Sequence, residues 1–268
     1  MKKIFSLSAL LCASLFSLTS CIEENFETPT PANDGDEIIF GARAGFEGSG
    51  TKTVYAGEAG YYQDENGKWF ERIDWVDDVD AIQIYCTEAG GPNPSNYTVH
   101  HSAGHETEND FAYLSKIGES SLQWKGDGDH HFYAMYPSQA LFENMETTLY
   151  QGIKMVGTTL HGIVPAAQPA TVTQNGKDWV AAPDMKYAYM AAKSTARKEK
   201  GSVSLSFVPI VTAVQIQMVL SSESIAPITI AEIQVSGSGI AGSFTADLSD
   251  KGWPSTQAYP TCSNVDAG

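Results

Sequence analysis

Apolar and polar residues alternate along several short stretches of this chain, and this alternation is the feature that most constrains its fold. In the clearest stretch, Val203, Leu205 and Phe207 are separated by single serines. A period of two places alternate side chains on opposite faces of an extended strand. The sequence therefore predicts an all-β fold of antiparallel strands with one dry and one wet face. The same alternation recurs at 37–41, 69–75, 82–84 and 214–220.

The first 20 residues are typical of a secretory signal. Lys2 and Lys3 precede a short apolar run, which is well below the about 20 apolar residues that a membrane crossing requires. The sequence Leu18-Thr19-Ser20-Cys21 then looks like the lipobox of bacterial lipoproteins, in which the cysteine becomes the first residue and carries acyl chains such as palmitate. The alternative is an ordinary cysteine near an unrelated cleavage site. We predict that Cys21 is lipidated and holds the chain at a membrane, since stable anchoring takes two or more acyl chains.

Residues 21–35 form an acidic, proline-bearing stretch without an apolar period, which indicates an extended tether. Its early acids resemble the acidic tags that follow the lipidated cysteine in surface-exported lipoproteins of the Bacteroides group. That resemblance implies a lipid-anchored position on the outside of the cell outer membrane.

The chain is strongly acidic. It has 16 basic and 32 acidic residues and a formal charge of −16, and the leader contains two lysines and no acid, so its removal gives −18. Phosphate backbones are bound through cationic contacts, so we exclude nucleic acid as a partner. Solubility and mutual repulsion at a crowded surface account for the acidity.

Two cysteines, Cys86 and Cys262, remain in the mature chain after loss of the leader and acylation of Cys21. An exported compartment permits a disulfide between them, and two free thiols are equally compatible with the spacing. The absence of a C-x-x-C pair from the sequence argues against metal clips and thioredoxin-type motifs.

Turn residues separate the predicted strands, a pattern that favours a β-sandwich or barrel. The length after the leader fits one large or two smaller domains. We place a boundary in the charged stretch 193–200, which gives an N-terminal β-sandwich at 36–197 and a second β domain at 198–268. The second unit is small and the sequence stops without a closing strand. We therefore expect its last strands to lie beyond this sequence or to come from another molecule.

Catalytic and metal-binding motifs fail in detail. His105 and Glu106 begin an H-E-x-x-H pattern, but Asn109 stands where its second histidine belongs. The acids at 74–80 and 126–129 lack the ligand positions of an EF-hand loop. No nucleophile elbow, P-loop or dinucleotide-binding motif occurs in the sequence. We therefore predict no enzymatic activity, no metal and no cofactor.

Aromatic residues give one alternative function. Exposed rings could form a sugar-stacking platform, which would make the chain a surface glycan-binding lipoprotein that does not polymerise. Several of these rings fall at core positions of predicted strands, so core packing is the favoured interpretation. The residues are Trp69, Trp75, Trp124, Phe132, Tyr133, Tyr136 and Trp179.

Several blocks of sequence together resemble the fimbrillin-like lipoproteins of the Bacteroides group. They are the lipobox and tether, Arg72-Ile73-Asp74-Trp75 leading into 80–85, the H-F-Y-A-M-Y-P block at 131–137 and the D-M-K-Y-A block at 184–188. The chain departs from the family pattern in a turn at 75–80 that is one residue longer, and in Pro209, where a histidine is common.

The resemblance implies two β-sandwich domains of transthyretin-like topology. It also implies a stalk, tip or anchor subunit of a fimbria that supports adhesion. In that family an arginine-specific protease removes the first strand, and a strand from a neighbour fills the groove by β-augmentation. The implied partners are other fimbrial subunits or further copies of the chain, the outer membrane through the lipid, and a host receptor or glycan.

Carried to this chain, the resemblance makes Ile38, Ile39 and Phe40 the exchangeable strand. Arg43 follows this predicted strand closely and is one of only three arginines. We predict cleavage between Arg43 and Ala44, which would free the chain from its lipid. The alternative is that Arg43 is a surface charge.

Overall fold

The computed structural model describes a large part of the chain. The described residues are 32–44, 54–55, 61–63, 69–71, 73–101, 112–142, 152–168, 170–175, 178–183, 185–211, 216, 232–255 and 260–264. Cys21 and the tether up to residue 31 lie outside them. The described residues contain short 3₁₀ helices and no α-helix.

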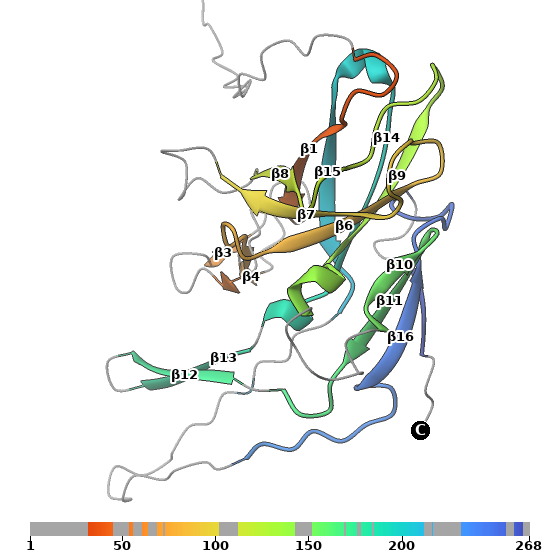
Figure 1. Ribbon diagram of the computed structural model, residues 1–268. Coiled ribbons are helices and arrows are strands. Elements are labelled where there is room, and N and C mark those ends of the chain that lie inside the picture. The colour runs from red at the N-terminus through yellow and green to blue at the C-terminus, as the bar shows by residue number, and fades with distance from the viewer. Residues whose placement is uncertain are drawn as a thin grey trace, which may run out of the picture.

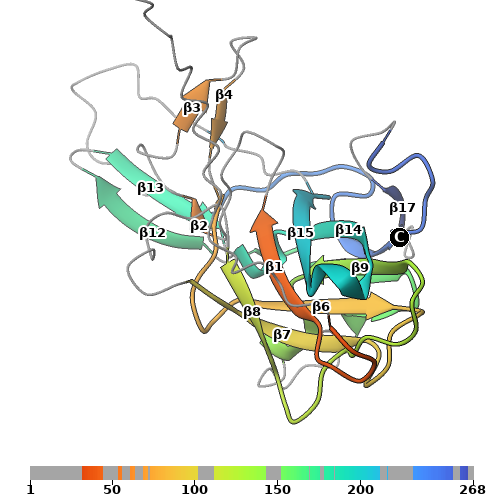
Figure 2. The ribbon, with the colours of Figure 1, turned by 90° about the horizontal axis from the view of Figure 1, so that it is seen from above.

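Seven strands form the largest sheet, which closes into a barrel (Figure 1). Around the barrel they follow the order β1 (Ile39–Ala44), β15 (Ser202–Pro209), β14 (Met190–Ala196), β9 (His130–Tyr136), β6 (Ala81–Cys86), β7 (Ser95–His100) and β8 (Ala112–Lys116). β1 runs parallel to β15 and antiparallel to β8, and these two pairings close the ring. Figure 2 shows β1 beside both partners.

A second sheet has four strands in the order β10 (Lys154–Val156), β11 (Thr159–Val164), β16 (Gly242–Asp247) and β17 (Thr261–Asn264). The other six strands form three two-stranded sheets. They are β2 (Val54–Tyr55) with β5 (Ile73–Asp74), β3 (Tyr61–Gln63) with β4 (Trp69–Glu71), and β12 (Ala170–Asn175) with β13 (Asp178–Pro183). The 3₁₀ helices are η2 (Gln139–Phe142), η4 (Met185–Tyr187) and η5 (Lys198–Lys200).

The barrel and the second sheet have separate hydrophobic cores that share a wall. On β9, Phe132 and Ala134 lie in the barrel core, whereas Met135 lies in the other core. Neighbouring β14 divides its side chains in the same way, with Ala192 in the barrel and Ala191 outside it. The four-stranded sheet therefore packs against the outer face of the barrel wall, and both faces of that wall are buried.

The predicted all-β class is confirmed. Alternation in β15 predicts its faces correctly, since Val203, Leu205 and Phe207 are buried while Ser204 and Ser206 are exposed. The first of the two expected sandwiches closes at its edges into a barrel because β1 pairs on both sides. At 214–220 only Ile216 is described, and it lies outside the named strands.

The division expected at residue 197 does not separate the two sheets. β15 follows that position yet lies in the barrel, paired with β1 and β14. β10 and β11 precede it yet belong to the second sheet, where β11 pairs with β16. Local charge at 193–200 marks the β14–β15 connection and η5. These pairings join residues far apart in the sequence, which local composition does not predict, and the domain boundary stays a prediction.

Packing inside the second sheet leads to a test at Gly162 of β11. A Cβ atom there would meet the Phe244 ring closer than carbon atoms can approach, and a ring carbon of Tyr189 at 3.0 Å. We expect Gly162→Ala to lower the free energy of unfolding by about 1–3 kcal/mol, the usual cost of overpacking. Denaturant unfolding measures the change. Gly128→Ala is the matched control and should be nearly neutral, because no atom lies within 4 Å of a Cβ there. Equal effects of the two changes would contradict the packing account.

Candidate functional site

β1 places every second side chain in the barrel core. Ile38, just before the strand, and Phe40 and Ala42 within it are buried, whereas Ile39 is 56% exposed. The Phe40 ring makes edge-to-face contacts with Tyr97 and Phe132, with ring centroids 5.1 and 5.4 Å apart. Phe40 therefore occupies the interior of the barrel. The strand runs over Ile39–Ala44, so it begins one residue after the predicted one and has one core face, and its exchange stays a prediction.

Both partners of β1 lie far from it in the sequence. Its register along β15 runs from Ile39 opposite Ser202 to Ala44 opposite Phe207. Its other edge pairs with β8, with Phe40 opposite Leu114. The remaining six strands form a continuous run, β15-β14-β9-β6-β7-β8, without β1. Within the described residues β1 thus has no hairpin partner, and its removal would open the barrel at a single place.

Residues 32–38, which we call the anchoring segment, fix the chain just before β1. Their backbone bonds to a strand-like stretch after β8, with Ile38 donating to the Leu122 carbonyl (3.0 Å) and Gly35 to the Trp124 carbonyl (2.8 Å). At the far end, Ala32 donates to the Lys198 carbonyl in η5 (3.1 Å). In Figure 1 the red segment before β1 accordingly runs past the loop that joins β14 and β15.

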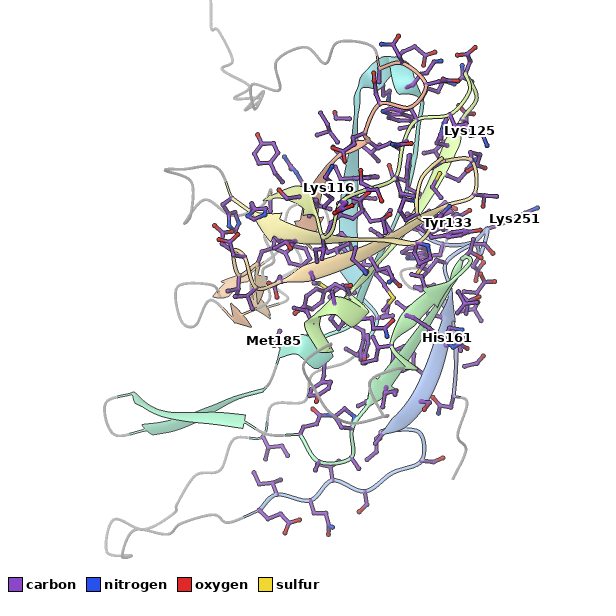
Figure 3. The ribbon with its side chains drawn as sticks, viewed as in Figure 1. Lys116, Lys125, Tyr133, His161, Met185 and Lys251 are labelled. Carbon is purple, nitrogen blue, oxygen red and sulfur yellow. The ribbon has the colours of Figure 1, made fainter. Side chains whose placement is uncertain are left out.

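Glu37 provides one side-chain contact of the anchoring segment. Its carboxylate forms an ion pair with Lys116, the last residue of β8, and accepts a hydrogen bond from the Ser121 hydroxyl at 2.7 Å. The bond from Lys116 and then that from Ser121 hold the pKa of Glu37 below its usual value. Figure 3 shows Lys116 on the β8 side of the barrel.

Asp34 provides a second contact. It lies 2.8 Å from the Lys198 ammonium and accepts a hydrogen bond from the Gly126 backbone N–H at 3.1 Å. Lys198 also pairs with Asp127 at 2.5 Å, and the bonds to Asp127 and Asp34 raise the pKa of Lys198. The segment before β1 is therefore held by charge as well as by main-chain bonds.

The predicted cleavage site lies inside β1. Arg43 was expected after the strand, but the parallel pairing continues through Arg43 opposite Ser206 and Ala44 opposite Phe207. The strand is longer than its strongly apolar part because backbone bonding to β15 continues past Phe40. The Arg43 side chain is exposed. Cleavage at Arg43 remains a prediction, and so does lipidation of Cys21, which lies outside the described residues.

Two histidines of the 100–105 cluster form pairs with acids of the 74–80 cluster. His100 contacts Asp78 at 2.6 Å and His101 contacts Asp77. Asp80 is buried and accepts hydrogen bonds from the Val76 N–H (2.6 Å) and the Tyr136 hydroxyl (3.0 Å). These contacts fix the turn before β6. Among the residues that the structure describes, no three His, Cys, Asp or Glu side chains are grouped as a metal site requires.

The aromatic residues mostly serve the core. Trp75, Trp124, Phe132 and Tyr136 are buried. Tyr133 is partly exposed beneath the Lys193 ammonium, which lies 5.9 Å from the ring centroid. Four of the seven rings proposed for a sugar platform are therefore unavailable to a ligand.

Cys86 and Cys262 are both free thiols. Burial raises the pKa of Cys86 to about 12, which keeps it protonated and unreactive. No helix in the described part of the chain has the length and apolar character needed to cross a membrane.

A family model described as fimbrillin-like matches residues 41–267. The chain belongs to the fimbrillin-like family. In this fimbrillin-like chain, the match begins inside β1 and includes both sheets.

No curated protein sequence matches this fimbrillin-like chain significantly. Among solved structures, a crystal structure from Bacteroides ovatus ATCC 8483, of a protein classed by inference as a cell adhesion protein, is 14% identical to it with a TM-score of 0.33. The similarity covers 66% of this chain and 53% of that one, so the chain spans about half the length of this relative.

The core position of Phe40 can be tested directly. We expect Phe40→Ala to lower the free energy of unfolding by about 3–5 kcal/mol, because it leaves a cavity among Tyr97 and Phe132. Ile39→Ala, at the exposed neighbouring position, should change it by less than about 0.5 kcal/mol. Thermal or denaturant unfolding measures both, and similar losses would mean that β1 does not face the core as described.

The Glu37 contact predicts a pH dependence. Because the folded pKa is depressed, the contribution of Glu37 is complete above about pH 4.5, the ordinary glutamate value, and is lost as the pH falls through the lower folded pKa. We expect Glu37→Gln to lower the free energy of unfolding by up to about 1 kcal/mol at pH 7, since the pair is partly exposed. The difference should vanish in acid. Glu119→Gln is the control, and a pH-independent loss would exclude the ion pair as its cause.

Proposed function

We propose that this chain is a structural subunit of a surface fimbria, with β1 as the strand that another subunit replaces during assembly. In this proposal Cys21 carries lipid and tethers the chain to the outer face of the outer membrane. The subunit supports adhesion through the assembled fimbria and has no enzymatic activity. The partners are other fimbrial subunits or further copies of the chain.

The position of β1 in the sheet order is the observation that carries this proposal. It lies between β15 and β8, which have no other pairing with each other in the described residues. The other six strands remain connected in its absence, so its loss would leave a groove with two facing, unpaired strand edges. Such a groove requires a strand, because only an extended backbone can satisfy both edges at once.

The side chains of β1 support the same mechanism. Phe40 and Ala42 fill the interior along this groove. An empty groove would expose apolar surface next to unpaired edges, a combination that promotes aggregation. A chain that carries its own first strand avoids this hazard until a partner strand arrives.

Release of β1 is proposed to follow cleavage between Arg43 and Ala44. This bond lies in the paired strand, so the end of β1 must open before a protease can bind it. Among the described residues, opening there breaks the last pairs with β15, because the pairing with the described part of β8 ends at Ala42. Strand ends open more readily than strand centres.

N-terminal sequencing and intact mass of protein sheared from cells test this sequence of events. We expect Ala44 as the first residue of the assembled form and a ladder of denaturation-resistant multimers on gels. Arg43→Ala should abolish both, whereas Arg197→Ala, which changes another exposed arginine, should preserve them. Assembled protein that begins only at acylated Cys21 would contradict cleavage and would instead identify a permanent anchor subunit.

A further inference from the structure

The contacts around the anchoring segment indicate which strand the barrel can accept. Resting on the proposed function, we propose that Lys116 and Ser121 select the incoming strand by binding a carboxylate at the position of Glu37. The partner is thus an extended segment of another subunit in which an acidic residue immediately precedes the apolar core-facing positions.

The main-chain contacts of this region cannot make such a selection. The carbonyls of Leu122, Trp124 and Lys198 accept hydrogen bonds from backbone N–H groups of the anchoring segment. Every residue except proline carries such a donor. These bonds therefore strengthen the binding of any extended segment and leave discrimination to the side chains.

The barrel interior supplies one part of the discrimination. Ile38, Phe40 and Ala42 present a large aliphatic, an aromatic and a small side chain in turn. Phe40 lies against Tyr97 and Phe132, and Ala42 is opposite Ala112 of β8, where space is set by the barrel wall. A strand shifted by two residues would still place alternate side chains inward, so apolar pattern alone specifies register weakly.

A carboxylate at the position of Glu37 resolves this ambiguity. When β1 and the anchoring segment leave, Lys116 loses the carboxylate that the described residues place on it. The Ser121 hydroxyl loses its 2.7 Å bond to Glu37 and keeps the longer one, at 3.4 Å, to the Leu122 carbonyl. Lys198 behaves differently, because it keeps Asp127 at 2.5 Å after Asp34 departs. The stronger demand for an incoming acid is therefore at Lys116, which faces the position of Glu37, one residue before the first core position at Ile38.

The charge of the whole chain increases the selectivity of this contact. With 32 acidic residues against 16 basic ones, two subunits repel each other over most of their surfaces. An acidic strand gains attraction only where a lysine is available. Lys116 therefore favours one register of an acidic strand, in the way that complementary rim charges fix register at interfaces.

A peptide exchange experiment tests this selection. The chain from residue 21, with Cys21→Ser, receives a site for a sequence-specific protease between Gly48 and Ser49, so that β1 is cut from the rest without relying on Arg43. The nicked protein keeps all its residues. A fluorescent peptide of residues 32–44 is then added in excess, and its incorporation is followed by anisotropy, with unlabelled variant peptides as competitors.

We expect the Glu37→Lys peptide to compete roughly fivefold less well than the native peptide, the change that loss of one rim attraction and gain of one repulsion produces. With Lys116→Glu protein, the order of the two peptides should reverse. Lys251→Glu is the matched control and should leave the native order unchanged, since exposed Lys251 follows β16 and Figure 3 places it well away from Lys116.

The outcomes separate the two proposals. If all peptides compete equally while the labelled peptide incorporates, the carboxylate selection is overturned and strand replacement stands. If no peptide incorporates, strand replacement itself fails and the selection fails with it. Should Lys116→Glu not fold, Lys116→Gln replaces it, and the native and Glu37→Gln peptides should then compete equally.

Discussion

The pairing of β1 with β15 on one edge and β8 on the other is the interaction on which the barrel depends. Six strands are connected to one another without β1, and that strand alone joins the two ends of the run. Its backbone satisfies two edges, and Phe40 fills the interior between them. The same strand, β1, therefore closes the barrel and completes its core. Within the described residues, no hairpin connects this strand to either of its partners.

The second sheet packs mainly against strands that do not pair with β1. Most of the barrel residues that support its core, such as Met135 and Ala191, come from β9 and β14. These strands lie on the opposite side of the ring order from the junction of β1 with β8. On the β1 side, Val208 near the end of β15 belongs to that core, and Ile210 and Val211 directly after the strand pack against it. In the ring order β15 lies between β1 and the shared wall of β14 and β9, so β1 has no pairing with that wall.

Sequence alternation predicted the faces of β1 and β15, because a strand with one buried face repeats every two residues whatever its partners are. It did not predict their parallel pairing, since residues 39 and 202 are brought together by the whole barrel. The end of β1 was placed too early because Gly41 and Ala42 carry little side-chain signal. The ion pairs of Glu37 and Asp34 were also missed, since their partners lie 79 and 164 residues away.

Apolar and charged residues make different contributions to stability at the start of the barrel. Burial of the Phe40 side chain contributes strongly to stability and depends little on the identity of each neighbour. A strand with a side chain of similar size at that position would be stabilised in the same way. Glu37 and Lys116 supply a partly exposed ion pair, which stabilises little but depends on position. In a chain of formal charge −16, lysines are scarce and carboxylates are common. Lys116 lies on β8 of the barrel, and Glu37 lies on the anchoring segment before β1. Under the strand-replacement proposal, an acidic incoming strand would therefore satisfy Lys116 in a single register.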